Sequence, residues 1–326
     1  MKEGDFIKRI IIAFLLLSLL FLSSCSKNRA ETISGFYLDT FCEITLYEDD
    51  KEFLEPAMEI IKKYDLLFDP KNPNSDIYKI NHSNGDPVDV SPATAKLIGI
   101  CLEYRSSSNN RYEPLIYTLS SLWKEGHLPD EDLIKSTLSE IKNAEISIKG
   151  NTITLFGGEF DPGSSAKGFI SGEIEEFLSK NGVKSGIINL GGNVQLIGSK
   201  NGNEYSVALK SPFEGQSAYS LSLKDRSIST CGTYERFFEE NGKIYHHILD
   251  VETGYPKESD LASVTVIGPD PTRTDILSTV CFLLGEADSQ SLEEFSNGYE
   301  AIFIYSLGKV SVTNGLEFND GQFKLK

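Results

Sequence analysis

The sequence predicts an α+β protein. Segments with the composition of strands and segments with helical periodicity occur in blocks, without the regular strand–helix–strand succession of a doubly wound sheet. No internal repeat or low-complexity linker divides the chain. We therefore expect one compact unit with two lobes after the N-terminal segment.

The first half of the chain is expected to supply several helices after an initial strand. Residues 33–48 are rich in aromatic and β-branched side chains, which favours a strand. Residues 51–68 carry apolar side chains at helical spacing and predict an amphipathic helix, which two prolines in residues 69–76 then end. Further helices are expected at residues 92–107, 115–123 and 130–141.

The second half is expected to combine short strands with two helices. Residues 144–156 predict a hairpin with its turn at Gly150-Asn151. Residues 166–181 place apolar side chains on one helical face, and Gly182 is the expected C-terminal stop. The remaining elements are short strands within residues 184–266, a helix at 272–284, and strands near 301–304 and 309–313 that are expected to close the molecule.

The N-terminus has the layout of an export signal. Three basic residues in positions 2–9 precede an apolar run of thirteen residues, which is too short for a bilayer-spanning helix of about 20. Leu22-Ser23-Ser24-Cys25 then resembles the bacterial lipobox, in which cleavage leaves a lipidated cysteine. An ordinary secretory signal with an incidental cysteine is the alternative.

This segment predicts the organisation and location of the chain. We expect a lipoprotein signal peptide at residues 1–24, a lipidated tether at 25–32 that begins with Cys25, and one folded domain at 33–326. A lipid anchor would hold that domain at the extracytoplasmic (periplasmic) face of a bacterial membrane without a spanning helix.

The charge of the chain limits its ligands. The formal net charge is −17, which opposes binding to phosphate backbones and excludes a general nucleic-acid-binding function. A phosphorylated ligand must therefore be held locally, by a metal ion, by amide groups at a helix start, or by one well-placed lysine.

The four cysteines after Cys25 show no zinc-binding spacing and no CxxC redox pair. They are expected to be small buried apolar residues, although an oxidising compartment would also allow disulfides. They are Cys42, Cys101, Cys231 and Cys281.

The stretch "DPGSSAKGFISG" (161–172) combines small residues, an acid and a lysine just before a predicted helix. Glycine and serine allow close approach of a ligand, the helix start carries a partial positive charge, and Lys167 can reach an anion. These are the features of a phosphate site. A helix cap, in which Ser164 or Ser165 pairs with free amides, is the simpler alternative.

Two further stretches are ambiguous when read alone. "INLGGNVQLIG" (188–198) fits a hairpin whose Gly191-Gly192 turn would also let a flat ligand pass closely. "YHHILDVETGYP" (245–256) adds two histidines and an acid beside a turn, where Asp250 and Gly254 alone would be turn residues.

The predicted helix in "PTRTDILSTVCFLLG" (271–285) places Asp275 and Thr279 four residues apart on one face. A carboxylate with a hydroxyl is an all-oxygen pair that suits Mg²⁺ better than zinc. Alternatively, Thr272 caps the helix and Asp275 complements its dipole.

Taken in order, these stretches resemble the ApbE family of FAD:protein FMN transferases. The matching segments are "NPNSDIYKIN", "NNRYEPLIYTLSSLW", "DPGSSAKGF", "INLGGNV", "STCGTYERFF", "HILDVETGYP", "SVTVIG" and "DILSTVCFLLG". The resemblance implies a T-fold-like arrangement of mixed β-sheets flanked by helices. It also implies an enzyme that binds FAD with Mg²⁺, cleaves the diphosphate, attaches FMN to a threonine of an acceptor protein and releases AMP.

The same resemblance implies roles for individual residues. The metal would be held by the carbonyl of Ser164 and the side chains of Asp275 and Thr279, and Asp275 would also serve catalysis. Lys167, which would contact the diphosphate, and His247, a supporting polar group at the reaction site, would be catalytic residues together with Asp275. The flavin nucleotide would be lined by Leu38, Arg111, Tyr112, Glu113, Asp161, Lys167 and Ile248.

The chain departs from the family pattern at three of these places. It has Leu38-Asp39-Thr40 where relatives usually have Met-Gly-Thr. Residues 111–113 are Arg-Tyr-Glu, where relatives usually have a small residue followed by Phe-Asp. Residues 230–232 are Thr-Cys-Gly, where relatives usually have Thr-Ser-Gly.

The family resemblance implies a flavoprotein subunit of a membrane redox complex as the acceptor. An FAD pyrophosphatase that gives FMN and AMP would have the same site, because water and threonine compete for the same phosphorus. A flavin-binding lipoprotein without turnover would bind flavin but would need no metal. A structural surface lipoprotein would bind no flavin at all.

Overall fold

The computed structural model describes residues 30–47 and 50–326. The predicted signal peptide and the lipidation site Cys25 lie outside these residues. The described end of the predicted tether already enters the first strand, β1 (Glu31–Tyr37). Within the described ranges, none of the helices combines the length and the apolar composition that a bilayer-spanning helix requires.

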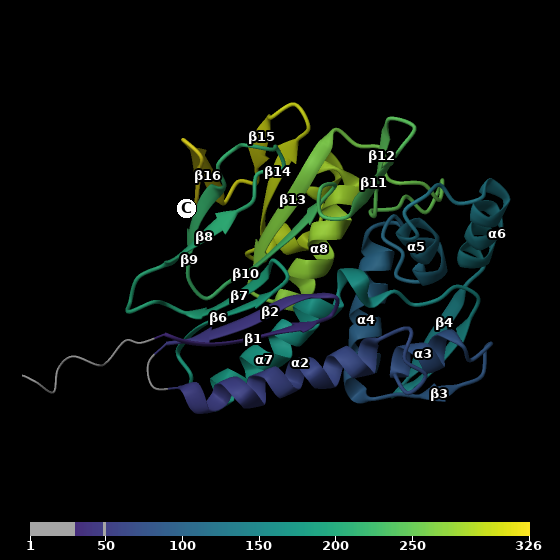
Figure 1. The fold of residues 1–326 in the computed structure, drawn as a ribbon, viewed down its shortest axis with the longest axis horizontal. Coiled ribbons are helices and arrows are strands. Elements are labelled where there is room, and N and C mark those ends of the chain that lie inside the picture. Colours follow the sequence, from purple (N-terminus) through teal and green to yellow (C-terminus); the bar gives the residue numbers. More distant parts are fainter. Residues whose placement is uncertain (1–29, 48–49) are drawn as a thin grey trace, which may run out of the picture.

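An eight-stranded antiparallel sheet forms the centre of the molecule (Figure 1). Its strands have the order β1-β2-β6-β7-β10-β13-β14-β15, so segments far apart in the sequence become neighbours. After β1 they are β2 (Thr40–Leu46), β6 (Ser185–Leu190), β7 (Asn193–Gly198), β10 (Ser227–Gly232), β13 (Leu261–Gly268), β14 (Glu300–Tyr305) and β15 (Val310–Val312).

Helices cover one face of this sheet and a second, smaller sheet covers part of the other. The helices α2 (Leu54–Phe68), α7 (Ala166–Lys180) and α8 (Pro271–Leu284) pack on the first face and bury the main apolar core. The small sheet has the order β16-β17-β9-β8 and encloses a second core that includes Ile302 and Phe323. Its strands are β8 (Tyr205–Leu209), β9 (Tyr219–Leu223), β16 (Leu316–Asn319) and β17 (Gln322–Leu325).

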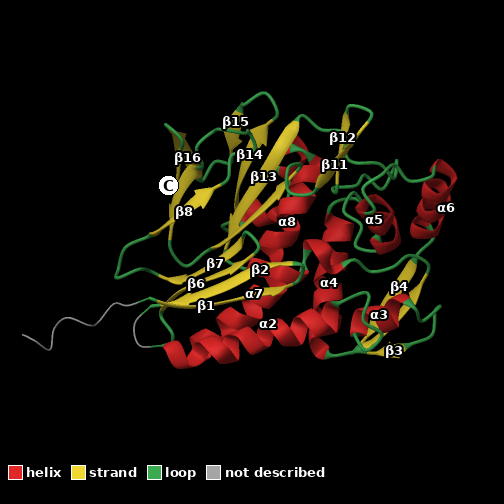
Figure 2. Cartoon of the chain, in the orientation of Figure 1, coloured by secondary structure: helices red, strands yellow, loops and turns green. Residues whose placement is uncertain are grey.

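The rest of the chain forms a largely helical group at one end of the sheet (Figure 2). A separate apolar cluster that includes Trp123, Ile134 and Leu249 joins α5 and α6 to the loop after β12. The elements are α3 (Asp76–Asn81), β3 (Val88–Asp89), α4 (Pro92–Ser107), α5 (Tyr117–Lys124), α6 (Glu131–Lys142), β4 (Glu145–Lys149), β5 (Thr152–Phe156), β11 (Phe237–Glu240) and β12 (Lys243–His246). Short helical turns complete the chain at η2 (Lys51–Phe53), η3 (Pro162–Ser164), α9 (Glu286–Ser289) and η4 (Glu293–Ser296).

The predicted α+β class is confirmed, and most of the predicted helices lie where periodicity places them. The end of α7 shows why glycine is a reliable signal there. Gly182 has a φ of 86°. Its N–H bonds to the carbonyl of Ser179, and the N–H of Val183 bonds to the carbonyl of Leu178. This pair of bonds is a Schellman motif, which ends the helix.

The expectation of one strand over residues 33–48 is wrong. The segment is a hairpin of β1 and β2, whose turn residues Leu38 and Asp39 both have a φ of 55°. Such a turn is usually made by Asn-Gly, so Leu-Asp gives no signal for it. The N–H of Leu38 donates a hydrogen bond to Asp65 in α2 (2.9 Å), which helps to hold the turn.

Two further differences concern short elements. The helix α3 is not expected from the sequence, because it follows two prolines; Ser75 caps it by accepting a hydrogen bond from the N–H of Tyr78 (2.9 Å). The strands after residue 300 do not close the molecule, since β16 and β17 follow them. These strands depend on packing of Leu316 and Phe323 against the second core rather than on a regular pattern.

Candidate active site

A cavity of about 760 Å³ brings the chemically informative segments together. It is lined by the turn before α7, one face of α8, the β6–β7 turn, the end of β10 and the segment after β12. Ten of the predicted site residues line it: Arg111, Tyr112, Glu113, Asp161, Ser164, Lys167, His247, Ile248, Asp275 and Thr279. Leu38 packs against the main core instead, and its neighbours Asp39 and Thr40 contribute to the lining.

The turn before α7 is built differently from a serine-capped helix. Asp161 accepts a hydrogen bond from the N–H of Gly163 (2.9 Å), and Ser164 Oγ pairs with the hydroxyl of Tyr112 (2.9 Å). Ser165 is the N-cap residue, but its side chain caps no amide of α7. The alternative in which Ser164 or Ser165 caps this helix is therefore wrong.

A carboxylate from another helix takes the place of that cap. Asp275 Oδ2 accepts a hydrogen bond from the N–H of Gly168 in the first turn of α7 (2.9 Å). Gly168 makes this approach possible, because a Cβ atom there would lie 2.3 Å from the carbonyl oxygen of Pro271 and 2.6 Å from Cβ of Asp275. The lysine-bearing turn and α8 are thus joined directly at the cavity.

Asp275 is held on its second oxygen as well. Ser229 in β10 donates a hydrogen bond to Asp275 Oδ1 (3.0 Å), and the aspartate is only 4% exposed. The α8 helix is capped by Asp270, which accepts from the N–H of Arg273 (3.0 Å). The alternative in which Thr272 caps α8 is therefore wrong, and Asp275 acts as a tertiary link instead.

The donor atoms around Asp275 suit a hard cation. Asp275, Thr279 and Ser164 line one cavity and carry oxygen atoms, the type of donor that Mg²⁺ prefers. No group of three or more His, Cys, Asp and Glu side chains that could hold a metal occurs in residues 30–47 and 50–326. The predicted set contains one acid, a hydroxyl and a backbone carbonyl, so it fits Mg²⁺ without such a group.

The cysteine that lines this cavity is neutral. Burial raises the pKa of the Cys231 thiol to about 12, although a hydrogen bond with Thr279 acts in the opposite direction. All four predicted core cysteines are free and buried, which confirms the expectation that they serve as small apolar residues.

The two adjacent histidines have different roles. His246 Nε2 donates to the carbonyl of Lys257 (3.1 Å), and its Nδ1 accepts from the N–H of Ile248 (3.3 Å), so both of its nitrogens are used by the fold. His247 Nδ1 donates to the carbonyl of Arg236 (3.1 Å). A carbonyl can only accept, so the neutral ring keeps its free lone pair on Nε2.

His247 is neutral near physiological pH. Its side chain opens on to the cavity, yet the protein crowded around the ring keeps enough water away to lower its pKa to about 4. The positive charges of Arg236 and Lys167 act in the same direction. The ring therefore offers the cavity an uncharged hydrogen-bond acceptor.

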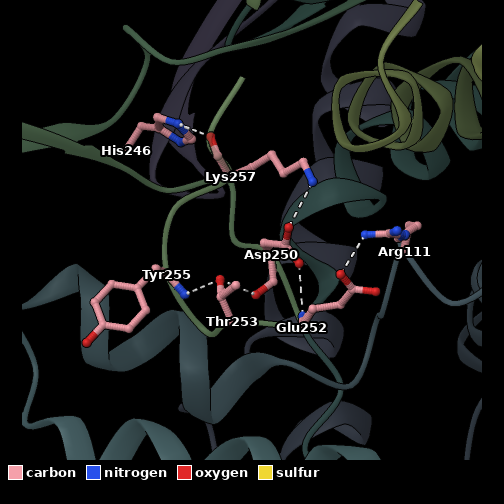
Figure 3. Close-up of polar contacts among 7 residues, drawn as sticks. All are labelled: Arg111, His246, Asp250, Glu252, Thr253, Tyr255 and Lys257. Carbon is pink, nitrogen blue, oxygen red and sulfur yellow. Dashed lines mark hydrogen bonds and ion pairs between the residues drawn. The ribbon is translucent and has the colours of Figure 1, made fainter. Parts of the chain in front are cut away.

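A polar network fixes the loop that follows these histidines (Figure 3). Lys257 Nζ and Asp250 Oδ2 form an ion pair at 2.8 Å, and Asp250 Oδ1 accepts from the N–H of Glu252 (2.9 Å). Arg111 reaches the same loop through an ion pair with Glu252 (2.9 Å). Burial alone would raise the pKa of Asp250, but these contacts outweigh burial and lower it.

Two more cavity residues serve mainly to build its wall. Glu113, a predicted flavin contact, is ion-paired with Arg105 (2.8 Å) and accepts from the N–H of Leu115 (3.1 Å). Burial raises the pKa of Glu113, and Arg105 opposes this change. Trp123, which is not among the predicted site residues, also lines the cavity and donates from Nε1 to the carbonyl of Gly254 (2.9 Å).

Comparison with known proteins gives a consistent result. The sequence profile of the ApbE family matches residues 38–303. An FAD:protein FMN transferase of Klebsiella pneumoniae is 33% identical over 86% of this chain and 90% of its own. One of Treponema pallidum is 29% identical, over 89% of this chain and 87% of its own.

Solved structures show the same fold. The ApbE protein of Thermotoga maritima superposes with a TM-score of 0.80 at 26% identity, covering 88% of this chain and 97% of the other. The flavinyl transferase ApbE of Pseudomonas stutzeri superposes with a TM-score of 0.76 at 23% identity, covering 89% of this chain and 96% of the other.

Proposed function

Because the chain belongs to the ApbE family, we propose that it transfers FMN from FAD to a threonine of an acceptor protein. The threonine oxygen forms a new bond to the phosphorus of the FMN half. The bond from this phosphorus to the oxygen of AMP breaks, AMP leaves, and the hydroxyl proton is released. Attack at a phosphorus requires accurate positioning and neutralisation of charge, which the cavity is built to provide.

The observation that carries this proposal is the direct link between the two halves of the site. The hydrogen bond from Gly168 N–H to Asp275 joins the first turn of α7, which also carries Lys167, to α8, which also carries Thr279. Lys167, Asp275 and Thr279 all line one cavity. Ser164, Asp275 and Thr279 would hold Mg²⁺ through oxygen atoms. When bound, Mg²⁺ supplies positive charge to the phosphoryl oxygens.

The remaining site residues bind and orient the substrates. Lys167 lies in the first turn of α7, where its ammonium group and the positive end of the helix both favour a phosphate. In this scheme, the diphosphate lies between Lys167 and Asp275. His247 offers a neutral Nε2 acceptor to a hydroxyl group of the substrate.

We expect Lys167→Ala to weaken FAD binding by about 10-fold or more, because a charged hydrogen-bond partner of the diphosphate is lost. Lys167→Arg keeps the charge and should bind FAD more tightly than Lys167→Ala. Lys180→Ala is the matched control, since Lys180 lies at the far end of the same helix and pairs there with Glu176. Titration of flavin fluorescence measures these affinities, and unchanged affinity in Lys167→Ala would remove Lys167 from the site.

We expect that protonation of His247 does not lower the rate of FAD cleavage between pH 7.5 and pH 5.5. Because the pKa of His247 is lowered to about 4, its ring remains neutral over this range. A histidine with an ordinary pKa near 6.5 would become largely protonated. The test compares pH–rate profiles of the wild-type protein and His247→Gln. A step near pH 6.5 that is present only in the wild type would contradict this expectation.

The proposal includes a membrane location. The lipobox-like sequence before Cys25 supports attachment through lipid at the extracytoplasmic side of a bacterial membrane. A flavoprotein subunit of a membrane redox complex would then be within reach as the acceptor. Labelling of Cys25 by a fatty-acid analogue, and loss of that labelling in Cys25→Ala, would support this part of the proposal.

The release of AMP tests whether the protein is an enzyme. Purified protein incubated with FAD should form AMP in the presence of Mg²⁺, and EDTA should stop the reaction. Binding of FAD without AMP formation would instead identify a flavin-binding protein without turnover.

A further inference from the structure

Four buried side chains between α7 and the main sheet have an oxygen atom without a hydrogen-bond partner among the residues that the structure describes. They are Ser171 in α7, Asn193 and Gln195 in β7, and Ser227 in β10. None of the four residues is more than 2% exposed. Buried acceptors are almost always paired with protein, ordered water or an ion. Four unpaired oxygens in this region therefore require partners, which are either ordered water or an ion.

These residues come from the facing surfaces of α7 and the main sheet. Gln195 lies opposite Ser227 in the pairing of β7 with β10, and Asn193 shares the face of Gln195 because it is two residues away. Ser171 and Glu175 are four residues apart on α7, which packs against β7. The amide of Gln195 lies against the Glu175 carboxylate. Glu175 thus lies at the edge of a group of unpaired oxygens.

Glu175 itself lacks a cationic partner. No ion pair with Glu175 occurs in the described part of the chain, and its charged neighbours are Asp225 and Asp270. The nearby Lys96 is paired with Glu173 (3.8 Å). Burial, followed by the two aspartates, raises the pKa of Glu175 to about 7, while Gln195 opposes this change.

We propose that Glu175 and these oxygens bind a monovalent cation, Na⁺ or K⁺, between α7 and the main sheet. One carboxylate and several neutral oxygens match a single positive charge where no phosphate binds, whereas a divalent ion held by one carboxylate is usually also bound by substrate phosphates. A pocket of about 220 Å³ is lined in part by Glu175, Glu176 and Asp270, so the Glu175 side of the cluster can be reached from solvent. The cation balances Glu175 and supplies the buried acceptors with a partner.

The cluster meets the active-site cavity at Asn193, which lines that cavity, but it contains none of the predicted Mg²⁺ ligands. Asn193 Nδ2 donates to Ser229 Oγ (3.4 Å), which in turn donates to Asp275 (3.0 Å). A cation bound in this cluster would therefore stabilise the packing of α7, which positions Gly168 against Asp275. The thermal unfolding midpoint measured without flavin reports on this cation site, and its result does not depend on the proposed function.

The experiment measures the thermal unfolding midpoint in NaCl, KCl and choline chloride at equal ionic strength. At pH 8.5 Glu175 is ionised, and we expect Na⁺ or K⁺ to raise the midpoint by about 2 °C relative to choline. At pH 5.5, below the pKa of about 7, the folded protein holds a proton on Glu175 and the difference should disappear. Comparison of NaCl with KCl identifies the preferred ion.

Two variants assign the effect to this cluster. Glu175→Gln removes the negative charge and should abolish the difference between the salts at pH 8.5. Glu176→Gln is the control, because Glu176 lies beside Glu175 on α7 but pairs with Lys180; it should keep the difference. Equal midpoints of the wild type in all three salts, or an ion effect that survives in Glu175→Gln, would overturn the proposal. A response to Ca²⁺ alone would overturn the monovalent assignment.

Discussion

Replacing Asp275 by asparagine is expected to lower Mg²⁺-dependent FAD cleavage by at least about 100-fold while the protein remains folded. Asp275 provides the only carboxylate of the predicted metal ligands. Asparagine keeps the size of the side chain and one acceptor oxygen, so it can still pair with Gly168 or Ser229. What it loses is the charge that holds a divalent cation.

The comparison with Asp275→Ala separates catalysis from folding. Alanine leaves the N–H of Gly168 and the hydroxyl of Ser229 without their acceptor, and an unpaired buried group costs about 1–3 kcal/mol. We therefore expect Asp275→Ala to lose stability as well as activity, and Asp275→Asn to lose mainly activity. AMP release and thermal unfolding are measured on both variants. A normal rate in Asp275→Asn would remove Asp275 from the metal site.

Gly168→Ala is expected to destabilise the protein by about 2–3 kcal/mol and to reduce FAD cleavage strongly. The added methyl group would lie 2.3 Å from the Pro271 carbonyl oxygen and 2.6 Å from Cβ of Asp275. Because the first obstacle is backbone, α7 and α8 must move apart. That movement breaks the hydrogen bond to Asp275 and separates Lys167 from Thr279.

Gly172→Ala provides a matched control on the next turn of α7. A Cβ atom there would come no closer than 3.3 Å to another atom, the Cγ atom of Pro271. Alanine also has a higher helix propensity than glycine, worth up to about 1 kcal/mol. We expect Gly172→Ala to retain stability and activity. If Gly168→Ala is as stable as Gly172→Ala in chemical denaturation, the close approach of the two helices has no structural importance.

Local signals explain why much of the fold can be predicted. The helix α4 begins after Ser91, which accepts a hydrogen bond from the N–H of Thr94 (3.1 Å), and it has the bounds expected from the sequence. The end of α7 at Gly182 likewise depends on residues close in the sequence. The β1–β2 turn escapes prediction because Leu38 and Asp39 are poor signals for positive φ, and Asp65, which holds the turn, lies 27 residues away from Leu38.

The candidate site shows the same limit. Spacing alone places Asp275 and Thr279 on one helix face, the small-residue turn before a predicted helix indicates Lys167, and the family resemblance adds His247. None of these signals can show that Asp275 caps the α7 helix, because the partners of that hydrogen bond lie 107 residues apart in the sequence. The contact of Ser229 with Asp275 escapes prediction for the same reason: the matching segment "STCGTYERFF" begins at Ser229, but the two residues lie 46 positions apart in the sequence.

The most direct test of the central claim is the intact mass of an acceptor protein after the reaction. A flavin-free flavoprotein subunit with a threonine-bearing segment is incubated with FAD, Mg²⁺ and either the wild-type protein or Asp275→Asn. With the wild type, we expect the acceptor to gain one FMN group and one AMP to form for each group transferred; with Asp275→Asn, the acceptor mass should not change. Free FMN and AMP with no gain in acceptor mass would contradict transfer and identify the protein as an FAD pyrophosphatase.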